Sequence, residues 1–472
     1  MKVLVIGSGG REHAVCAAFA RSNKVSKIYC APGNAGIAAV AECVPVKTED
    51  IFVLAEFASA NGINLTYVGG ETALALGIVD EFEKRGLRIV GVSKRAAALE
   101  ASKSFAKDFM VRHGVPTALY KTAHSAADAV GILESGAFGD ESAPVVVKAD
   151  GLAAGKGVVV AKDRAEAISA IDDMETLVGA DAAGLIVLEE CLFGREVSLL
   201  AFADGENFAL MPPTRDHKRI GEGDTGPNTG GMGTITDSTL LTSEQLEQII
   251  EKMIKPTLAG CTAEGIPFRG IMFLGIMLAE AFSSQRSAVS GEEKTVPQTD
   301  AEARALARAE EVGQVPDAAL AYARASAPDG TPMLLEYNVR FGDPETQSIL
   351  VRLETDLVDI CDAVIDGTLD NLPISWREGN SATVVLASAG YPEKPRTGDV
   401  ISGVEKAAAR TGVSVFHAGT SVNNDGELVT SGGRVLGVTA TADNLPEALR
   451  KAYEAAGEIL WEGMQYRRDI GR

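Results

Sequence analysis

The sequence predicts an α/β protein of several domains, whose N-terminal domain is built on a doubly wound parallel sheet. Short apolar runs alternate with helical patterns through about the first hundred residues, which is typical of parallel strands joined by crossover helices. The chain has 472 residues, of which 46% are hydrophobic. That length suggests about three domains, and the composition is sufficient for a core in each.

The N-terminal elements are expected in a regular order, and we place the end of this domain at residue 102. Helical patterns predict helices at 11–21, 51–61 and 72–85. Apolar runs predict strands at 2–6, 27–30, 65–68 and 88–90.

The second region, 103–380, combines short strands with few helices and predicts an α+β arrangement, with a small lobe at about 120–190 covering a larger one. Strands are predicted at 145–149, 157–161, 185–189 and 196–202, with a helix at 164–174. Strands at 271–278 and 333–341 are expected to be neighbours. Residues 283–330 between them have few large apolar side chains, so we interpret them as a partly disordered surface insertion with a helix at 300–311.

The last region, 381–472, predicts a separate small domain. Its strands are expected at 383–387, 413–417 and 434–439, with a closing helix at 445–461.

The formal net charge of −21 argues against general binding to nucleic acid or to anionic membranes. Six widely spaced cysteines are typical of reduced thiols and form no CxxC pair. No apolar run reaches the roughly 20 residues needed to span a bilayer, and the N-terminal run is too short for a signal peptide. We therefore expect a cytoplasmic protein.

A glycine loop at residues 7–10 follows the first predicted strand directly. A dinucleotide-binding loop would need a third glycine where this chain has Glu12, and a carboxylate at the end of the second strand, where there is none. The sequence therefore argues against NAD binding. Two readings remain, a tight turn without a ligand and a set of helix N-terminal amides that hold a phosphate.

Lys148 lies inside an apolar run and precedes a loop with three glycines (Gly151, Gly155 and Gly157). The loop departs from the Walker pattern, because Asp150 replaces its first glycine and Gly157 replaces its hydroxyl residue. A lysine on a rigid strand can still hold a polyphosphate together with the loop amides. The alternative is an exposed hairpin with an ordinary surface lysine.

The segment 188–197 links two predicted strands. Its backbone could face the edge of an adenine while Glu196 faces the ribose hydroxyls. Two adjacent glutamates, Glu189 and Glu190, equally favour a solvated turn.

The stretch 333–345 carries the most specific pattern. Along a strand, Glu336, Asn338 and Arg340 would share one face, and Leu335, Tyr337, Val339 and Phe341 the other. A carboxylate and an amide oxygen two residues apart suit Mg²⁺, and an adjacent arginine can bind an anion. The alternative is a half-exposed strand, which seldom ends in a turn such as Gly342-Asp343-Pro344-Glu345.

A basic cluster at 214–219, which includes Asp216 and Lys218, precedes a polar glycine loop at 225–233. In an acidic protein such a local patch suits a small anionic substrate. The alternative is a charged, flexible surface loop.

Together these segments resemble the glycinamide ribonucleotide synthetase (phosphoribosylamine–glycine ligase) family of the ATP-grasp superfamily. The matching motifs are GSGGREHA at 7–14, APGNAG at 31–36, VVVKADGLAAGKGV at 145–158, DHKRIGEGDTGPNTGGMG at 216–233, EYNVRFGDPETQ at 336–347 and SGGRVLGVTA at 431–440. The resemblance implies a two-lobed ATP-grasp core, and an ATP-dependent ligation of glycine to 5-phosphoribosylamine through glycyl phosphate, early in purine synthesis. It also implies a Mg²⁺ or Mn²⁺ cofactor and a monomeric enzyme.

By the same resemblance, site residues can be assigned in four groups. The ATP group is Lys103, Lys148, Gly151, Gly155, Gly157, Glu189, Glu190, Leu192 and Glu196. The metal ligands are Glu336 and Asn338, and the catalytic residues are Asp216 and Arg340. The substrate group is Gly9, Gly10, Arg11, Asn34, Lys218, Thr225, Gly226, Pro227, Asn228, Thr229, Gly230 and Asp343.

One departure from the family lies at residues 69–74, where Glu71 remains but both expected prolines are missing. Two other functions stay open beside the one implied. One is another ATP-grasp carboxylate–amine ligase or a carboxylase, and the other is a nucleotide-binding protein without ligase activity.

Overall fold

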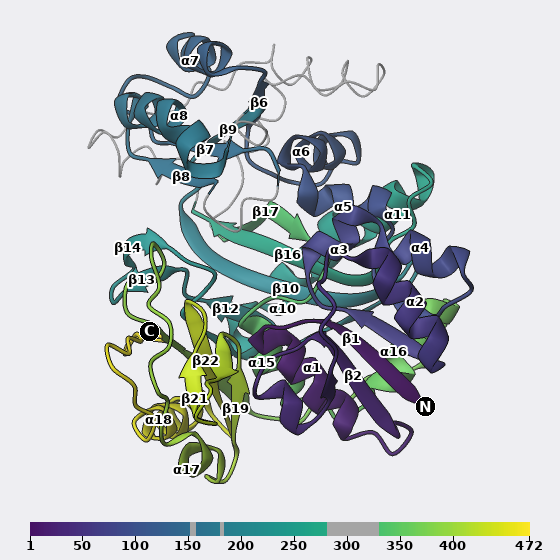
Figure 1. Ribbon diagram of the computed structural model, residues 1–472. Helices are drawn as coiled ribbons and strands as arrows, with labels where there is room; N and C mark the ends of the chain where they lie inside the picture. Colours follow the sequence, from purple (N-terminus) through teal and green to yellow (C-terminus); the bar gives the residue numbers. More distant parts are fainter. Residues whose placement is uncertain (152–156, 180–183, 281–329) are drawn as a thin grey trace.

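The computed structural model describes residues 1–151, 157–179, 184–280 and 330–472. Gly155, the helix expected at 300–311 and nearly all of the insertion at 283–330 lie outside these ranges. In Figure 1 a small lobe stands above a large curved sheet, with the N-terminal and C-terminal regions side by side below it.

The N-terminal region is a five-stranded parallel sheet in the order β3-β2-β1-β4-β5, which confirms the doubly wound prediction. Its strands are β1 (Lys2–Gly7), β2 (Lys27–Pro32), β3 (Glu42–Cys43), β4 (Leu65–Val68) and β5 (Ile89–Val90). The helices α1 (Gly10–Ala20), α2 (Ile51–Asn61), α3 (Glu71–Leu76) and α4 (Ile78–Lys84) join them. Every β1 residue after Lys2 is buried, as parallel strands covered on both faces require.

The single helix expected at 72–85 is in fact two helices, α3 and α4. Gly77 separates them with a φ of +93°, a left-handed conformation that ends α3 and that side chains with a Cβ avoid. The apolar pattern continues across this break, so periodicity alone could not locate it.

The small lobe at the top of Figure 1 is a four-stranded antiparallel sheet in the order β6-β9-β7-β8. Its strands are β6 (Tyr120–Ala123), β7 (Val145–Ala149), β8 (Val158–Ala161) and β9 (Ile186–Glu190). Helices α7 (Ala126–Glu134) and α8 (Arg164–Val178) pack against it around an apolar core of their own.

The large sheet has nine strands in the order β17-β16-β10-β12-β15-β18-β22-β19, with β11 paired to β10. The second region, 103–380, contributes β10 (Gly194–Asp204), β11 (Phe208–Leu210), β12 (Thr214–Asp216), β15 (Gly233–Thr236), β16 (Arg269–Ala279) and β17 (Thr331–Asn338). The last region adds β18 (Asn380–Ala387), β19 (Val413–His417) and β22 (Arg434–Ala442). Because β15 pairs with β18, the C-terminal region continues this sheet, and a separate small domain at 381–472 stays a prediction.

A β-bulge at Leu335 interrupts the alternation of side chains that was predicted for β17. Gly275 opposes Glu336 and Ile276 opposes Leu334, so Leu335 is the extra residue. Leu335 therefore packs with Met277 and Met333 instead of sharing the core of Tyr337. Glu336 and Asn338 follow the bulge and keep their two-residue spacing.

The remaining elements connect or cover these sheets. They are α5 (Lys94–Ala101), α6 (Lys103–Arg112), β13 (Arg219–Gly221), β14 (Thr225–Asn228), α10 (Ser243–Ile249), α11 (Lys255–Ala263), α15 (Glu345–Leu350), α16 (Leu357–Asp366), α17 (Val404–Ala408), β20 (Thr420–Val422), β21 (Leu428–Thr430) and α18 (Leu445–Ala456). The last helix ends five residues before the expected 461. None of the helices in the described ranges is long and apolar enough to cross a membrane.

Candidate active site

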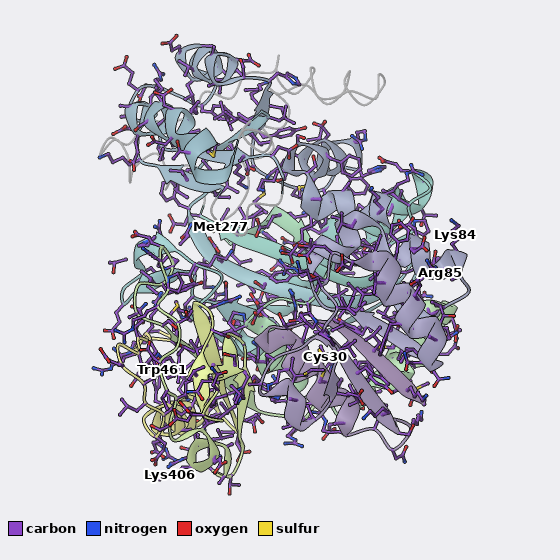
Figure 2. The ribbon with its side chains drawn as sticks, in the orientation of Figure 1. Cys30, Lys84, Arg85, Met277, Lys406 and Trp461 are labelled. Carbon is purple, nitrogen blue, oxygen red and sulfur yellow. The ribbon has the colours of Figure 1, made fainter. Side chains whose placement is uncertain are left out.

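A cleft of about 900 Å³ lies where the small lobe faces the large sheet. Figure 2 labels Met277 of β16, which lines this cleft on the sheet below the small lobe. Most of the predicted site residues line it: Arg11, Lys103, Lys148, Gly151, Gly157, Glu189, Glu190, Leu192, Glu196, Asp216, Lys218, Asn228, Thr229, Gly230, Glu336, Asn338, Arg340 and Asp343. Residues separated by more than 300 positions thus meet in one space.

Six predicted substrate residues do not line this cleft: Gly9, Gly10, Asn34, Thr225, Gly226 and Pro227. The last three lie on the exposed strand β14. Gly155, from the loop after Lys148, lies outside the described residues.

On the small-lobe side of the cleft, Glu189 joins two lysines. Its carboxylate lies 2.6 Å from Lys148 Nζ and 2.8 Å from Lys107 Nζ, and both Glu189 and Lys107 are only 2% exposed. Burial alone would raise the pKa of the Glu189 carboxyl, but the two lysines outweigh it and lower the pKa. Lys148 therefore stands on β7 at the cleft with its position fixed by a buried partner.

Lys103 begins α6 and donates a hydrogen bond to the carbonyl of Gly151, at 2.9 Å. Ser102 caps the same helix and also donates to Asp150, at 3.0 Å. These contacts fasten the start of the glycine loop to the N-terminus of α6. Burial is the main cause that lowers the pKa of Lys103, and nearby Lys148 contributes to the shift.

The end of β9, the linker after it and the start of β10 line the cleft with Glu190, Leu192 and Glu196, respectively. Glu190 Oε1 accepts a hydrogen bond from the backbone of Leu119, at 2.8 Å, which ties the linker to β6. Glu196 lies 3.3 Å from Lys218 Nζ. The segment is therefore part of a binding cleft and not a solvated turn.

The two predicted metal ligands, Glu336 and Asn338, lie side by side on the cleft face of β17. Within the described ranges, no lysine or arginine nitrogen lies within 4.0 Å of the Glu336 carboxylate. Burial would raise the pKa of Glu336, but Lys218, Lys148 and Lys103 together lower it. An ionised carboxylate without an ion-pair partner, next to an amide oxygen, fits a hard divalent cation that also binds phosphate oxygens.

Arg340 was expected to share the strand face with Glu336, but β17 ends at Asn338. The Arg340 guanidinium contacts Glu100 at 2.8 Å and Glu71 at 3.2 Å, and it donates a hydrogen bond to Asn338 Oδ1 at 3.0 Å. Two carboxylates thus balance its charge, so Arg340 is less available as an anion clamp than its sequence position predicts.

At the opposite end of the cleft, Asp343 forms an ion pair with Arg434 at 3.0 Å. Burial would raise the pKa of the Asp343 carboxyl, but Arg434 and Arg11 lower it. Arg434 begins β22, so the C-terminal region supplies a charged residue to this end of the site.

The glycine loop after β1 is partly filled by its own helix. Glu12 accepts a hydrogen bond from Gly9 N–H at 2.6 Å and forms an ion pair with Arg11 at 2.6 Å. The amide of Gly9, which the sequence assigned to a phosphate, therefore already has a carboxylate partner. Gly10 lies close to Gln347, since a Cβ there would come within 2.6 Å of Gln347 Nε2.

Asn34 uses its whole side chain within the protein. Its Nδ2 donates to the carbonyls of Ser8 and His417, each at 2.8 Å, and its Oδ1 accepts from Gly36 and Ile37, each at 2.9 Å. An amide has two donor hydrogens and one acceptor oxygen. Asn34 therefore joins the glycine loop to the C-terminal region rather than facing a substrate, which corrects the prediction.

Comparison with known proteins gives the chain a family. Its N-terminal 100 residues match the phosphoribosylglycinamide synthetase N domain, residues 101–285 match the ATP-grasp (A) domain and residues 381–472 match the C domain. The chain belongs to the phosphoribosylglycinamide synthetase family.

Relatives and solved structures agree with this assignment. A phosphoribosylamine–glycine ligase from Ralstonia nicotianae is 44% identical, with 100% of this chain and 99% of that protein covered. One from Chlorobaculum tepidum is also 44% identical, with the same coverage. The crystal structure of the Thermotoga maritima phosphoribosylamine–glycine ligase is 32% identical, with a TM-score of 0.76 and 100% of both chains covered.

A biotin carboxylase from Campylobacter jejuni shares the fold alone, at 15% identity and a TM-score of 0.67 over 99% of this chain and 93% of that one. The fold is therefore wider than the phosphoribosylglycinamide synthetase family. The six motifs, and not the fold, distinguish the family.

The cleft residues that the sequence did not assign to the site include Lys107, Glu71, Glu345 and Arg434. Glu345 and Arg434 lie within quoted motifs, GDPE and SGGRVL, but no spacing rule indicated their partners. Glu71 keeps its place despite the missing prolines of this family, because it pairs with Arg340. Lys107 lies four residues after Lys103, so its position one helical turn further on the same face was the available signal.

Proposed function

We propose that this cleft joins glycine to 5-phosphoribosylamine at the expense of ATP, giving 5′-phosphoribosylglycinamide, ADP and phosphate. The observation that carries the proposal is the convergence of Lys103, Lys148 and the ionised Glu336 on one cleft in a member of this ligase family. The glycine carboxylate attacks the γ-phosphate of ATP, and the amine of phosphoribosylamine then displaces phosphate from glycyl phosphate. The protein contributes positioning and charge neutralisation, as in other phosphoryl transfers.

The nucleotide end binds ATP. Lys148 and Lys103 face its phosphates, together with Gly151 and Gly157. The backbone between Glu189 and Leu192 faces adenine, and Glu196 faces the ribose. In support of this, every residue of this ATP group that the structure describes lines the same cleft.

A divalent cation, Mg²⁺ or Mn²⁺, is held by Glu336 and Asn338. When bound, it neutralises charge on the transferred phosphoryl group. The Glu336 carboxylate supplies the negative ligand, and Asn338 Oδ1 retains a second lone pair beside the one that Arg340 uses.

The phosphoribosyl group lies toward Arg11 and Asp343, at the end of the cleft where the N-terminal and C-terminal regions meet. The same proposal divides the chain into three functional units, with boundaries near residues 102 and 380. It also includes a monomeric state and a cytoplasmic location.

The test is a coupled assay of ADP release in which each substrate is omitted in turn. We expect release to require ATP, a divalent cation and glycine, with full turnover only in the presence of phosphoribosylamine. Other amino acids and bicarbonate replace glycine in parallel reactions. Equal turnover with another acid would favour a different ATP-grasp ligase or a carboxylase, and no turnover with any acid would favour a nucleotide-binding role.

A further inference from the structure

The hairpin of β13 and β14 forms part of the cleft wall but has no core of its own. Arg219, Asp224 and Asn228 line the cleft. None of the residues from 219 to 228 is buried, and the two strands form a two-stranded sheet of their own. Because an isolated two-stranded hairpin is only marginally stable in water, contacts from other parts of the chain must fix its position.

Those contacts come from the segment that follows α18. In Figure 1 the end of the chain marked C lies next to β13 and β14. Gly223 N–H, in the turn of the hairpin, donates to Asp469 Oδ2 at 2.8 Å. Gly471 N–H donates to His217 Nε2 at 3.1 Å, two residues before β13. Residues more than 240 positions further along the chain therefore hold the hairpin.

Arg467 makes the central contact, and its side chain is only 2% exposed. One terminal nitrogen of its guanidinium donates to Asp224 Oδ1 at 2.6 Å and to the carbonyl of Arg219 at 3.1 Å. Its Nε and its other terminal nitrogen donate to the two oxygens of Asp469, at 2.8 and 2.7 Å. The hydrogen bond from Arg467 is the main cause that lowers the pKa of Asp469 to about 2. One guanidinium thus joins the segment after α18 to the first strand and to the turn of the hairpin.

The backbone of Asp224 shows that the turn depends on this contact. Its φ is +53°, and among the residues that the structure describes it is the one non-glycine residue with a positive φ. Side chains with a Cβ disfavour this left-handed conformation, although aspartate and asparagine tolerate it better than most. Such a conformation persists where surrounding contacts determine it. The Asp224 side chain is 69% exposed, so the ion pair with Arg467, and not burial, is that contact.

The base of the hairpin carries two residues of the active-site cleft. Lys218 directly precedes β13 and Thr229 directly follows β14, and both line the cleft. The Lys218 carbonyl accepts hydrogen bonds from Thr229 N–H at 2.7 Å and from the Thr229 hydroxyl at 2.8 Å. A change in the orientation of the hairpin would therefore move both side chains. Lys103 and Lys148 of the ATP group lie on other elements, α6 and β7.

We propose that Arg467 is a positioning residue of the active site. Through Asp224 it holds the hairpin in the orientation that directs Lys218 and Thr229 into the cleft. Arg467 does not itself line the cleft, so it acts through these residues. The inference rests on the proposed ligase function, and it makes the segment after α18 part of the active-site architecture.

Two variants of the full-length protein separate the contact from the charge. Arg467→Lys keeps the positive charge but loses the planar fork that reaches Asp224 and both oxygens of Asp469 at once. Asp224→Asn removes the charge at the other end and keeps a residue that tolerates a left-handed φ. Arg468→Lys is the matched control, because the exposed side chain of this neighbouring arginine lies over the ring of Tyr466.

The first measurement is amide hydrogen exchange without substrates, which follows the hairpin independently of activity. We expect Arg467→Lys to speed exchange in residues 217–230 about tenfold, the effect of losing one charge-assisted hydrogen bond. Asp224→Asn should speed it about threefold, and the control should match the wild type. Exchange in β22 and α18 should not change in any variant. Unchanged exchange at 217–230 in a folded Arg467→Lys protein overturns the proposal.

The second measurement is the Michaelis constant for each substrate, obtained from ADP release. We expect Arg467→Lys to raise the KM for glycine about tenfold and to leave the KM for ATP within about twofold. Combining it with Asp224→Asn should add nothing further, because both substitutions break the same contact. Faster exchange with an unchanged KM for glycine would refute the active-site role. Equal rises in both Michaelis constants, or effects that multiply in the double variant, would refute it as well.

The positioning role and the proposed reaction fail in different ways. If the wild-type protein releases no ADP in response to glycine, the proposed function fails, and the exchange measurement still tests the contact. If the wild type is active and Arg467→Lys matches it in exchange and in KM, only the positioning role fails. Should Arg467→Lys not fold, Asp224→Asn makes the same test from an exposed side chain.

Discussion

Glu189 at the nucleotide end of the cleft and Glu345 at the substrate end make an instructive pair. Both are almost fully buried, at 2% and 4% exposure. Lys107 and Lys148 flank Glu189, and its pKa is lowered. Glu345 has Asp216 as its charged neighbour instead, and its pKa is raised.

The difference shows that burial does not by itself decide the charge of a carboxyl group. Burial disfavours the ion at both sites, and the neighbouring charges determine whether that penalty is offset. A buried acid that pairs with two lysines has its charge balanced without a ligand, and it fixes the positions of those lysines. A buried acid beside another acid is incomplete and favours the binding of a cation. Four experiments would sharpen or break this distinction.

The largest expected effect concerns Glu336, a half-buried acid of the cleft, which has a lowered pKa and no ion-pair partner among the described residues. We expect Glu336→Gln to reduce kcat for ADP release by about a thousandfold, because losing a metal ligand removes several kcal/mol of charge neutralisation. Circular dichroism checks that the variant is folded. Near-normal turnover in a folded variant would show that Glu336 does not hold the metal.

Next in size is the loss of Glu189. Replacing it with glutamine removes the carboxylate that pairs with Lys107 and Lys148, and breaking a buried pair of this kind costs about 3–5 kcal/mol. We expect the free energy of unfolding in urea to fall by that order. Lys24→Met, which breaks an exposed ion pair with Asp359, is the matched control and should cost far less, because solvent screens a surface pair. Similar losses in both variants would remove the distinction between the two kinds of site.

A smaller effect is expected in the pH dependence of Glu345. The folded chain keeps its proton up to a pKa of about 8, whereas the unfolded chain releases it near the ordinary value of 4.5. Between these values the folded state binds more protons, so stability falls as pH rises, and the contribution is constant above the folded pKa. Asp216, Lys218 and Arg340 are the charged groups that face it.

The measurement is the melting temperature of wild type and Glu345→Gln at pH 5, 6.5 and 8, without substrates or metal. We expect the variant to gain a few degrees relative to the wild type between the first and last pH, which is the shift that about 4 kcal/mol makes in a chain of this length. A difference that does not change with pH would mean that Glu345 is ionised in the folded chain and has a counter-charge.

The smallest effect should come from removing residues 281–329. The strands on either side pair directly, with Ala279 opposite Thr331 and Gly330 N–H donating to the Ala279 carbonyl at 2.8 Å. Deleting the segment leaves Glu280 and Gly330 as a two-residue loop, and Glu280→Asn gives it the Asn-Gly sequence of a tight hairpin. Gly330 already has the positive φ, +80°, that such a turn uses.

We expect the shortened protein to melt within a few degrees of the wild type and to keep its rate of ADP release, because loop closure changes by only about 0.6 kcal/mol for each doubling of length. Both ends of the cleft would then be held by the described residues alone. A large loss of stability or activity would show that the removed segment supports one of them.

Much of the local structure could be predicted from the sequence. The strands at 65–68, 145–149 and 413–417 and the helix at 51–61 were predicted with the bounds that the structure has. Apolar periodicity and β-branched runs are properties of neighbouring residues, so a sequence window contains the information that determines them. The motifs at 145–158 and 336–347 likewise brought a lysine, a glycine loop and a carboxylate–amide pair to the same cleft.

The tertiary structure decided which of these groups have partners. Leu335 changes faces because β16 opposes it with one residue fewer. Arg340 forms ion pairs with Glu71 and Glu100, which lie more than 200 positions away. Asn34 donates one of its side-chain hydrogen bonds to the carbonyl of His417 in the last region.

The resemblance assigned Glu189 to the ATP group and gave Glu345 no role, but nothing in the sequence distinguished the charge of the two carboxyl groups. The charge of a buried group depends on the groups within a few ångströms, and these come from distant segments that only the folded chain brings together. The sequence determined which chemical groups are present, and the fold determined which of them are left to bind a ligand.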